Sequence, residues 1–101
     1  YLPALFNMGM IYEILCEHKE ALMFFERVLK LDPKDLTDTA EFRALRAKIR
    51  VLGKLGKDEE ALACCHMALK LEATNRLRRG IPIKATMKEI EKRLRSEKNL
   101  R

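Results

Sequence analysis

The sequence lacks tryptophan, and glycine and proline together supply only seven of its 101 residues. Sheets joined by tight turns use more of both residues, so this composition favours helices. No stretch approaches the roughly 18 consecutive apolar residues that a membrane-spanning helix requires. The apolar share of 48% is ordinary for a globular protein and argues against disorder along the whole chain.

Cysteine is scarce, and the three cysteines do not resemble a disulfide framework. Their number is odd, and Cys64 and Cys65 are adjacent, so we expect free thiols and a cytoplasmic or other reducing intracellular compartment. Cys64, Cys65 and His66 are consecutive, but neighbouring side chains on a helix diverge by roughly 100° and do not converge on one ion. Zinc ligands come in spaced pairs. We therefore expect no metal and no other cofactor.

Catalytic residues are also missing from the pattern. Cys16 and His18 stand close together in an expected turn, and the simplest interpretation is that both are solvated. A thiol nucleophile would need a paired base and an oxyanion site. The sequence supplies no such set, so we do not expect an enzyme.

The positive charge is concentrated at one end of the chain. Residues 74–101 carry ten Lys and Arg against three acids, whereas residues 1–73 carry eleven against twelve. Three interpretations of this tail are open: a solvating cap, nucleic-acid binding, and attachment to an acidic membrane surface. The tail has no aromatic side chain to stack a base, and its apolar stripe lacks Phe and Trp. We favour the cap over nucleic acid or a membrane as a partner.

Residues 5–33 contain the most specific pattern in the chain. The small residues Gly9 and Ala21 stand where two antiparallel helices must approach closely, and the bulky Tyr12 and Phe25 fill the space beside them. Pro33 ends the second helix, because proline lacks an N–H and disfavours helix at the preceding residue. The pattern consists of Leu5, Met8, Gly9, Tyr12, Ala21, Phe25 and Pro33.

Apolar periodicity predicts which helix faces are buried in this segment. In the first helix, one face carries Leu5, Met8, Tyr12 and Leu15, which we expect to pack on the second helix. A second strip beside it, which we expect to border a groove, consists of Phe6, Met10 and Ile14. The second helix extends to about Leu31, and its inward stripe is Ala21, Leu22, Phe25, Val28 and Leu29.

The pattern recurs in the next part of the chain at one constant shift in residue number. The matched pairs are Leu5 with Leu45, Tyr12 with Leu52, Ala21 with Ala61, Phe25 with Cys65, Val28 with Ala68 and Leu29 with Leu69. The second copy is less regular, since Ile49 stands in place of Gly9 and Ala73 in place of Pro33. A period longer than ~34 residues indicates about six inserted residues, which we place within PKDLTDTAEF.

Local signals predict where the later helices begin and end. Asp38 with Glu41 is expected to cap the third helix, Gly56 to end it in a left-handed conformation, and Asp58 to cap the fourth. Beyond Gly80 and Pro82, an amphipathic helix carries an apolar stripe, and Thr86 with Glu89 would form a capping box within it. That stripe consists of Ile83, Met87, Ile90 and Leu94.

The pattern of residues 5–33 resembles the tetratricopeptide repeat, in which a large apolar residue precedes L-G-x2-Y, then A-x3-F, then Pro. Residues 1–73 resemble two such repeats, at about 2–33 and 40–73, followed by a linker and a basic C-terminal helix over 74–101. The resemblance implies an all-α fold of two antiparallel helix pairs, a fragment of a right-handed solenoid, with the basic helix as a cap. Since the chain starts at Tyr1, we expect a piece of a longer protein.

The resemblance also implies a non-catalytic adaptor or scaffold that binds a peptide or helix in a concave groove. In that family the first helix of each pair lines the concave surface. Carried over to this chain, the groove consists of Phe6, Asn7, Met10, Glu13 and Ile14 from the first repeat and Arg43, Arg46, Arg50 and Lys54 from the second. An apolar end beside a basic end suits an amphipathic or acidic peptide, because Arg pairs bidentately with carboxylates.

Three alternatives remain open. In the first, the basic residues assigned to the groove form an ordinary solvent-exposed helix face and bind no ligand, because charged helix faces are common. The module would instead be a structural or self-associating segment of a longer array, since about three repeats are usually needed for stability. Nucleic-acid binding through the tail is the third. Some family members clamp the C-terminal carboxylate of chaperones with Asn, Lys and Arg, but only Asn7 and Arg43 fit, and Ala47 stands opposite Asn7, so we do not expect that ligand.

Overall fold

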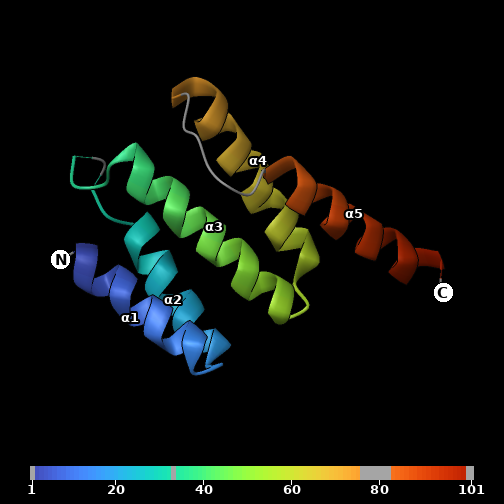
Figure 1. The fold of residues 1–101 in the computed structure, drawn as a ribbon, viewed down its shortest axis with the longest axis horizontal. Helices are drawn as coiled ribbons and strands as arrows, with labels where there is room; N and C mark the ends of the chain where they lie inside the picture. Colours follow the sequence, from blue (N-terminus) through green and yellow to red (C-terminus); the bar gives the residue numbers. More distant parts are fainter. Residues whose placement is uncertain (1, 33, 76–82, 100–101) are drawn as a thin grey trace.

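The computed structural model describes residues 2–32, 34–75 and 83–99, and the described chain folds into five α-helices (Figure 1). These are α1 (Leu2–Ile14), α2 (His18–Leu29), α3 (Asp38–Lys54), α4 (Asp58–Asn75) and α5 (Ile83–Asn99). No strand occurs in these ranges, and the predicted all-α fold class is confirmed. None of these helices combines the length and the apolar character needed to cross a membrane.

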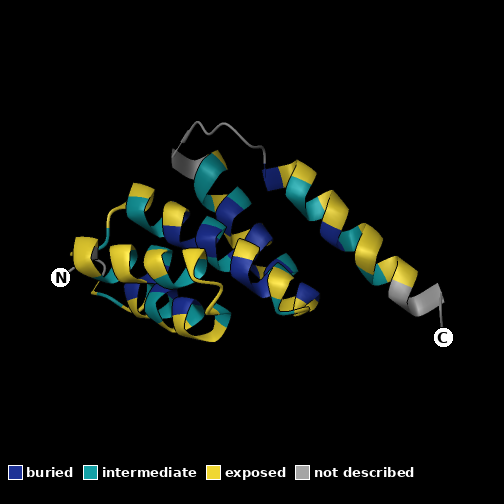
Figure 2. Ribbon diagram, turned by 60° about the horizontal axis from the view of Figure 1, so that its bottom comes forward, coloured by how far each residue is buried: buried dark blue, intermediate teal, exposed yellow. Residues whose placement is uncertain are grey.

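The helices pack in chain order, each on its neighbour. α1 and α2 form one antiparallel pair and α3 and α4 a second, while α2 packs on α3 and α5 packs on α4 (Figure 1). The buried residues lie between successive helices (Figure 2), in two clusters. One cluster joins α2 to α3 through Phe25 and Val51, and the other joins α3, α4 and α5 through Leu52, Cys65 and Ile90.

The close approach predicted at Gly9 is present. A Cβ atom built on Gly9 would lie 2.6 Å from Cε1 of Phe25, a separation that real Cβ atoms essentially never show. Phe25 is fully buried, and its ring centroid lies 5.6 Å from that of Phe6. The missing side chain therefore makes room for an aromatic ring between α1 and α2.

The turn inside each pair follows the same hydrogen-bond plan. After α1, the Glu17 amide donates to the Tyr12 carbonyl at 2.9 Å, and the equivalent amide and carbonyl after α3 form the same bond at 2.9 Å. Such a bond from an amide to a carbonyl five residues earlier is one of the two that define a Schellman motif. Gly56 has the predicted positive φ of 76°, and Cys16 holds the equivalent position with φ 61°. The left-handed cysteine was not predicted.

Three predicted helix caps are wrong. Thr37, with extended backbone, accepts the Ala40 amide at 3.1 Å and caps α3, so Asp38 lies inside the first turn. Asp58 begins α4 and directs its carboxylate to α5 instead of capping. α5 begins at Ile83, so Thr86 lies within the helix and does not start it. Each predicted capping residue lies near the start of a helix, but the helix begins at a different residue from the one that the prediction implies.

α5 covers the end of the second pair. Ile83 and Ile90 are 3% and 1% exposed and belong to the cluster with α3 and α4, as the predicted stripe requires. Arg93 donates to both oxygens of Asp58, with Nη2–Oδ1 at 2.9 Å and Nε–Oδ2 at 3.3 Å. The Asp58 side chain is 5% exposed, so this bidentate pair satisfies a buried carboxylate and holds α5 on α4.

Candidate functional site

α1 and α3 lie side by side and form two neighbouring pockets that share Phe6 and Arg43. The first, of about 200 Å³, is lined by Pro3, Phe6, Asn7, Ala40 and Arg43. The second, of about 140 Å³, is lined by Phe6, Met10, Arg43, Arg46 and Arg50. We call these eight residues the α1–α3 groove. α3 supplies its cations, and α1 supplies its larger apolar side chains.

The centre of the groove is a cation–π contact. The guanidinium carbon of Arg43 lies 4.7 Å from the centroid of the Phe6 ring. The Phe6 ring also packs against the ring of Phe25, which restricts its movement beneath the guanidinium. Arg43 is exposed and has no ion pair within the described part of the chain. Its N–H donors thus remain available on the solvent side.

Arg50 is held differently, by a carboxylate from α1. Its Nε and Nη2 donate to the two oxygens of Glu13 at 2.8 and 2.9 Å, and Nη2 also lies 3.8 Å from Sδ of Met10. The hydrogen bond that Arg50 donates to Glu13 raises the pKa of Arg50, against the opposing effect of its partial burial. Glu13 thereby neutralises the charge of Arg50, which serves to tie α1 to α3.

The structure brings together six of the nine predicted groove residues as pocket lining: Phe6, Asn7, Met10, Arg43, Arg46 and Arg50. Glu13 joins them through its pair with Arg50. Ile14 and Lys54 line neither pocket, and Ile14 is 76% exposed. Their place in a binding site stays a prediction.

Two lining residues were missed by the sequence analysis. Pro3 and Ala40 line the first pocket. Ala40 lies in the segment that lengthens the repeat beyond its usual period, so periodicity gave no signal for it. Pro3 is the equivalent of Arg43 in the first repeat, and that equivalence was the available hint that both line one surface.

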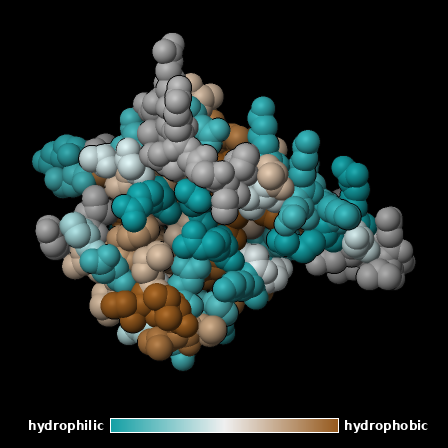
Figure 3. All heavy atoms as spheres, viewed as in Figure 1, coloured by the Kyte–Doolittle hydropathy of each residue, from teal (hydrophilic) through white to brown (hydrophobic). Residues whose placement is uncertain are grey.

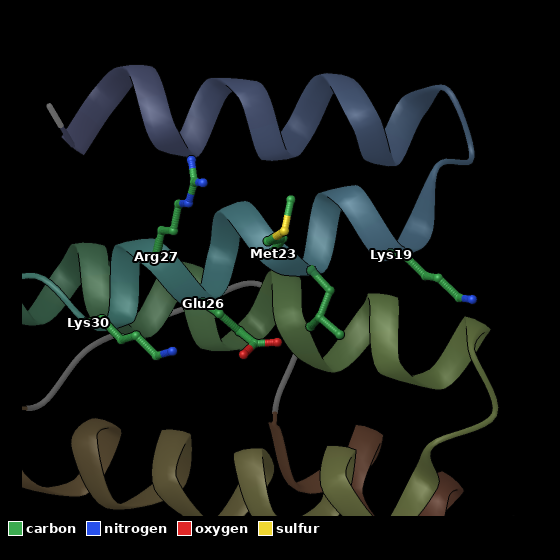
Figure 4. A pocket seen from close by; sticks show the side chains of 6 residues that line it. Lys19, Met23, Glu26, Arg27 and Lys30 are labelled. Carbon is green, nitrogen blue, oxygen red and sulfur yellow. The ribbon is translucent and has the colours of Figure 1, made fainter.

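A larger pocket, of about 360 Å³, lies on the surface of α2, but its lining does not converge. Its residues come from α2 and the residue that directly follows it: Lys19, Leu22, Met23, Glu26, Arg27 and Lys30. Figure 4 shows Arg27 and Met23 extending toward α1, whereas Lys19 and Lys30 start at opposite ends of α2 and extend away from α1. Side chains that spread apart in this way do not surround a small ligand.

Cys65, the equivalent of Phe25, is fully buried, and Cys64 is buried as well, at 5% exposed. Burial raises the pKa of Cys65 to about 11 and is the main cause of the raised pKa of Cys64. Both thiols are thus protonated near neutral pH and are weak nucleophiles. Within the described residues, no group of three or more His, Cys, Asp and Glu side chains is arranged to hold a metal ion.

Comparison with known families identifies the first helix pair. The family model of the tetratricopeptide repeat matches residues 3–35, which contain α2 and all but the first residue of α1. Comparisons with curated proteins and with solved structures gave no match. Repeats of this family generally mediate protein–protein interactions and form non-catalytic scaffolds. The match covers α1 and α2 and identifies this first helix pair as a tetratricopeptide repeat.

Proposed function

We propose that this protein is an adaptor whose α1–α3 groove binds an acidic peptide segment of a partner protein. The observation that carries the proposal is the contact of Arg43 with Phe6, which both pockets share. It places a cation with available donors directly beside an apolar surface. A peptide with a carboxylate next to a large apolar side chain would engage both groups at once.

The charge of the groove comes from Arg43 and Arg46. Arg50 is neutralised by Glu13, so it contributes structure more than attraction for a ligand. Arg46 is partly buried, lines the second pocket and has no ion pair in the described ranges. Two guanidinium groups one helical turn apart on α3 match two carboxylates of an extended or helical ligand.

The proposal includes α3 and α4 as a second repeat. The turn after α1 and the turn after α3 form the same hydrogen bonds at equivalent positions, and the equivalent residues Ala21 and Ala61 are both fully buried. Two adjacent repeats form a groove between the first helix of one repeat and the first helix of the next. The alternative roles, a structural segment of a longer array and nucleic-acid binding through the basic tail, remain proposals of lower rank.

A peptide array tests this proposal. We would compare twelve-residue peptides of alternating Glu and Leu with matched Gln and Leu peptides, and measure binding to the wild type and to an Arg43→Glu/Arg46→Glu variant. The expected result is binding of the Glu peptides alone, reduced at least about tenfold by the double variant. A Lys70→Glu/Lys84→Glu variant, with the same charge change on residues outside the groove, is the control.

Equal binding of the Glu and Gln peptides would contradict an acidic specificity. An equal loss in the two double variants would show a general charge effect and would refute the assignment to the groove. Circular dichroism of each variant establishes that the helices are intact, since all four substituted side chains lie on the surface or are only partly buried.

A further inference from the structure

Three arginines of α3 line a single pocket of the α1–α3 groove. Arg43, Arg46 and Arg50 lie three and four residues apart, a spacing that keeps them on one face of the helix. The pocket has a volume of about 140 Å³, and its other lining residues are Phe6 and Met10 of α1. Three guanidinium groups thus border one small space, which we call the arginine pocket.

The two outer arginines of this pocket are held in place by α1. The guanidinium carbon of Arg43 lies 4.7 Å from the centroid of the Phe6 ring. Arg50 donates two hydrogen bonds to Glu13, at 2.8 and 2.9 Å. Arg46 stands between them along the helix and is partly buried. A long side chain that is already restrained loses less conformational entropy when a ligand binds, so the arginine pocket is preorganised for an anion.

Acidic side chains neutralise only one of these three guanidinium groups. Glu13 is the only charged residue of α1, its side chain is 10% exposed, and Arg50 binds both of its oxygens. Neither Arg43 nor Arg46 forms an ion pair with a described residue. The arginine pocket therefore keeps two positive charges for a ligand.

The rest of α1 supplies no competing carboxylate. Met8 and Ile11 are 38% and 49% exposed, Leu15 after the helix is 62% exposed, and Figure 3 shows apolar surface over the end of α1, at the lower left. Periodicity predicted that Met8 and Leu15 pack on α2, and this was wrong. α2 contacts α1 at Gly9, which lies roughly 100° around the helix from Met8. An anion in the arginine pocket would meet no carboxylate of α1 other than Glu13.

The charge and size of the arginine pocket favour a phosphate monoester over carboxylates. One carboxylate carries a single charge and would leave one guanidinium group without a partner, whereas two carboxylates in so small a space repel each other. A phosphorylated side chain carries about two negative charges at pH 7 and presents three acceptor oxygens on one phosphorus atom. The pocket volume of about 140 Å³ equals the liquid volume of roughly five water molecules, which is enough for one phosphate group.

The apolar lining beside the arginines indicates that this phosphate belongs to a peptide. Phe6 and Met10 line the arginine pocket, and Phe6 also lines the neighbouring pocket of about 200 Å³. That pocket has further apolar lining from Pro3 and Ala40. A free phosphate ion would leave this apolar surface in water, whereas an apolar side chain beside a phosphorylated residue would cover it. A nucleic-acid phosphate carries only one charge and matches the arginine pocket less well.

We propose that the arginine pocket binds the phosphate of a phosphoserine or phosphothreonine in a partner peptide, with an apolar residue of the same peptide in the neighbouring pocket. The inference rests on the proposed function, because it names the anion that the α1–α3 groove selects. Arg43 and Arg46 donate to the phosphate oxygens, while Arg50 ties α1 to α3 through Glu13. The peptide becomes a ligand only after its hydroxyl group has been phosphorylated, so a protein kinase that acts on the partner controls the complex.

Peptides that differ at one position test the proposal. The parent is the alternating Gln and Leu peptide, in which one central Gln is replaced by phosphoserine, Glu or Ser. Fluorescence anisotropy of the labelled peptides measures their affinity for the wild type. The phosphoserine peptide is expected to bind at least about tenfold more tightly than the Glu peptide, because only the phosphate brings two charges to the pocket. The Ser peptide should bind most weakly of the three.

Two variants of α3 locate the phosphate. Arg46→Gln should bring the affinities of the phosphoserine and Glu peptides close together, because one of the two available charges is lost. Lys48→Gln removes the same charge from the same helix, at a residue that lines neither pocket, and should leave the preference for phosphoserine unchanged. Circular dichroism establishes that the helices are intact in both variants.

Equal affinity of the phosphoserine and Glu peptides would overturn this inference and leave the acidic specificity of the groove standing. Binding of the alternating Glu and Leu peptide without binding of the phosphoserine peptide would have the same meaning. If neither peptide binds, the proposed function fails as well. An equal loss in Arg46→Gln and Lys48→Gln would overturn the assignment to the pocket. Displacement of the phosphoserine peptide by an equal concentration of inorganic phosphate or of a single-stranded oligonucleotide would overturn the choice of a phosphopeptide.

Discussion

α1 and α3 hold the same place in successive helix pairs, but they differ in how many of their faces are covered. α3 has α2 on one side and α4 on another, and seven of its residues are buried. α1 packs on α2 and lies beside α3 across the groove, while Met8 and Ile11 on its outer side are 38% and 49% exposed. The comparison shows that the number of neighbouring helices among the described residues decides how much of each helix is buried.

The division of charge follows the same comparison. α1 carries one charged residue, whereas α3 carries Arg43, Arg46 and Arg50 along the side that faces α1. One of these is neutralised by Glu13 and ties the helices together. The others are free to attract a ligand. A groove between two such helices has an apolar wall and a basic wall.

The largest expected effect is a difference in stability between two glycine substitutions, one in α1 and one in α3. Gly9→Ala should reduce the free energy of unfolding by about 2 kcal/mol, because the new methyl group would overlap the Phe25 ring, which is fully buried. Gly53→Ala, in α3, meets only Arg93 Nη2 at 3.5 Å and should be neutral or stabilising by up to ~1 kcal/mol. Urea denaturation measures both, and equal destabilisation by the two variants would contradict the packing described for α1 and α2.

A somewhat smaller effect is expected where α5 packs on α4. Asp58→Asn should destabilise the protein by about 1.5 kcal/mol, a value reduced because Arg93 is about half exposed and can be hydrated. Glu59→Gln, at the next residue, is exposed and should change the stability by no more than ~0.5 kcal/mol. Thermal denaturation compares the two variants. If both have the same midpoint, the bidentate pair does not hold α5.

The two turns can be exchanged in a reciprocal test. Cys16→Gly should stabilise the protein by about 1 kcal/mol, because a non-glycine residue is strained at φ 61°. Gly56→Cys should destabilise it by a similar amount at the equivalent position. Chemical denaturation under reducing conditions measures both changes. Two changes of the same sign would show that the turns are not equivalent.

The smallest predicted effect is a dependence of the free energy of unfolding on pH, which arises from Cys65 in α4. The pKa of Cys65 is raised from 9.0 to about 11 by burial, so folding favours the neutral thiol. Its contribution to stability is complete below pH 9 and is lost as the pH rises toward 11. In a Cys65→Ala variant the decline of stability over this range should be shallower than in the wild type. An unchanged slope would argue against the burial of this thiol.

Much of the fold was predictable because it rests on local periodicity and backbone geometry. Gly9 beside Phe25, the left-handed Gly56 and the buried stripe of α5 all follow from spacing. The pairs Arg50–Glu13 and Arg93–Asp58 join residues 37 and 35 positions apart. Such pairs depend on the register between helices, which periodicity along one helix does not contain.

The candidate site was predicted in its composition but not in its internal pairing. The apolar residues Phe6 and Met10 and the basic residue Arg43 line the pockets between α1 and α3, and their role in binding stays a prediction. The sequence did not indicate that Glu13 would neutralise Arg50, since both residues were expected to face a ligand. Met8 was expected to face α2 and is partly exposed, because periodicity gives the phase of a stripe but not the position of the neighbouring helix.

The most direct test of the proposed adaptor role is an amide chemical-shift titration of the isotopically labelled chain with the Glu–Leu peptide. The account predicts that the shifts cluster on residues 6, 7, 10, 43 and 46, and that they disappear in the Arg43→Glu/Arg46→Glu variant. Shifts confined to α5 would identify the basic C-terminal helix as the acidic-ligand site and would contradict the account.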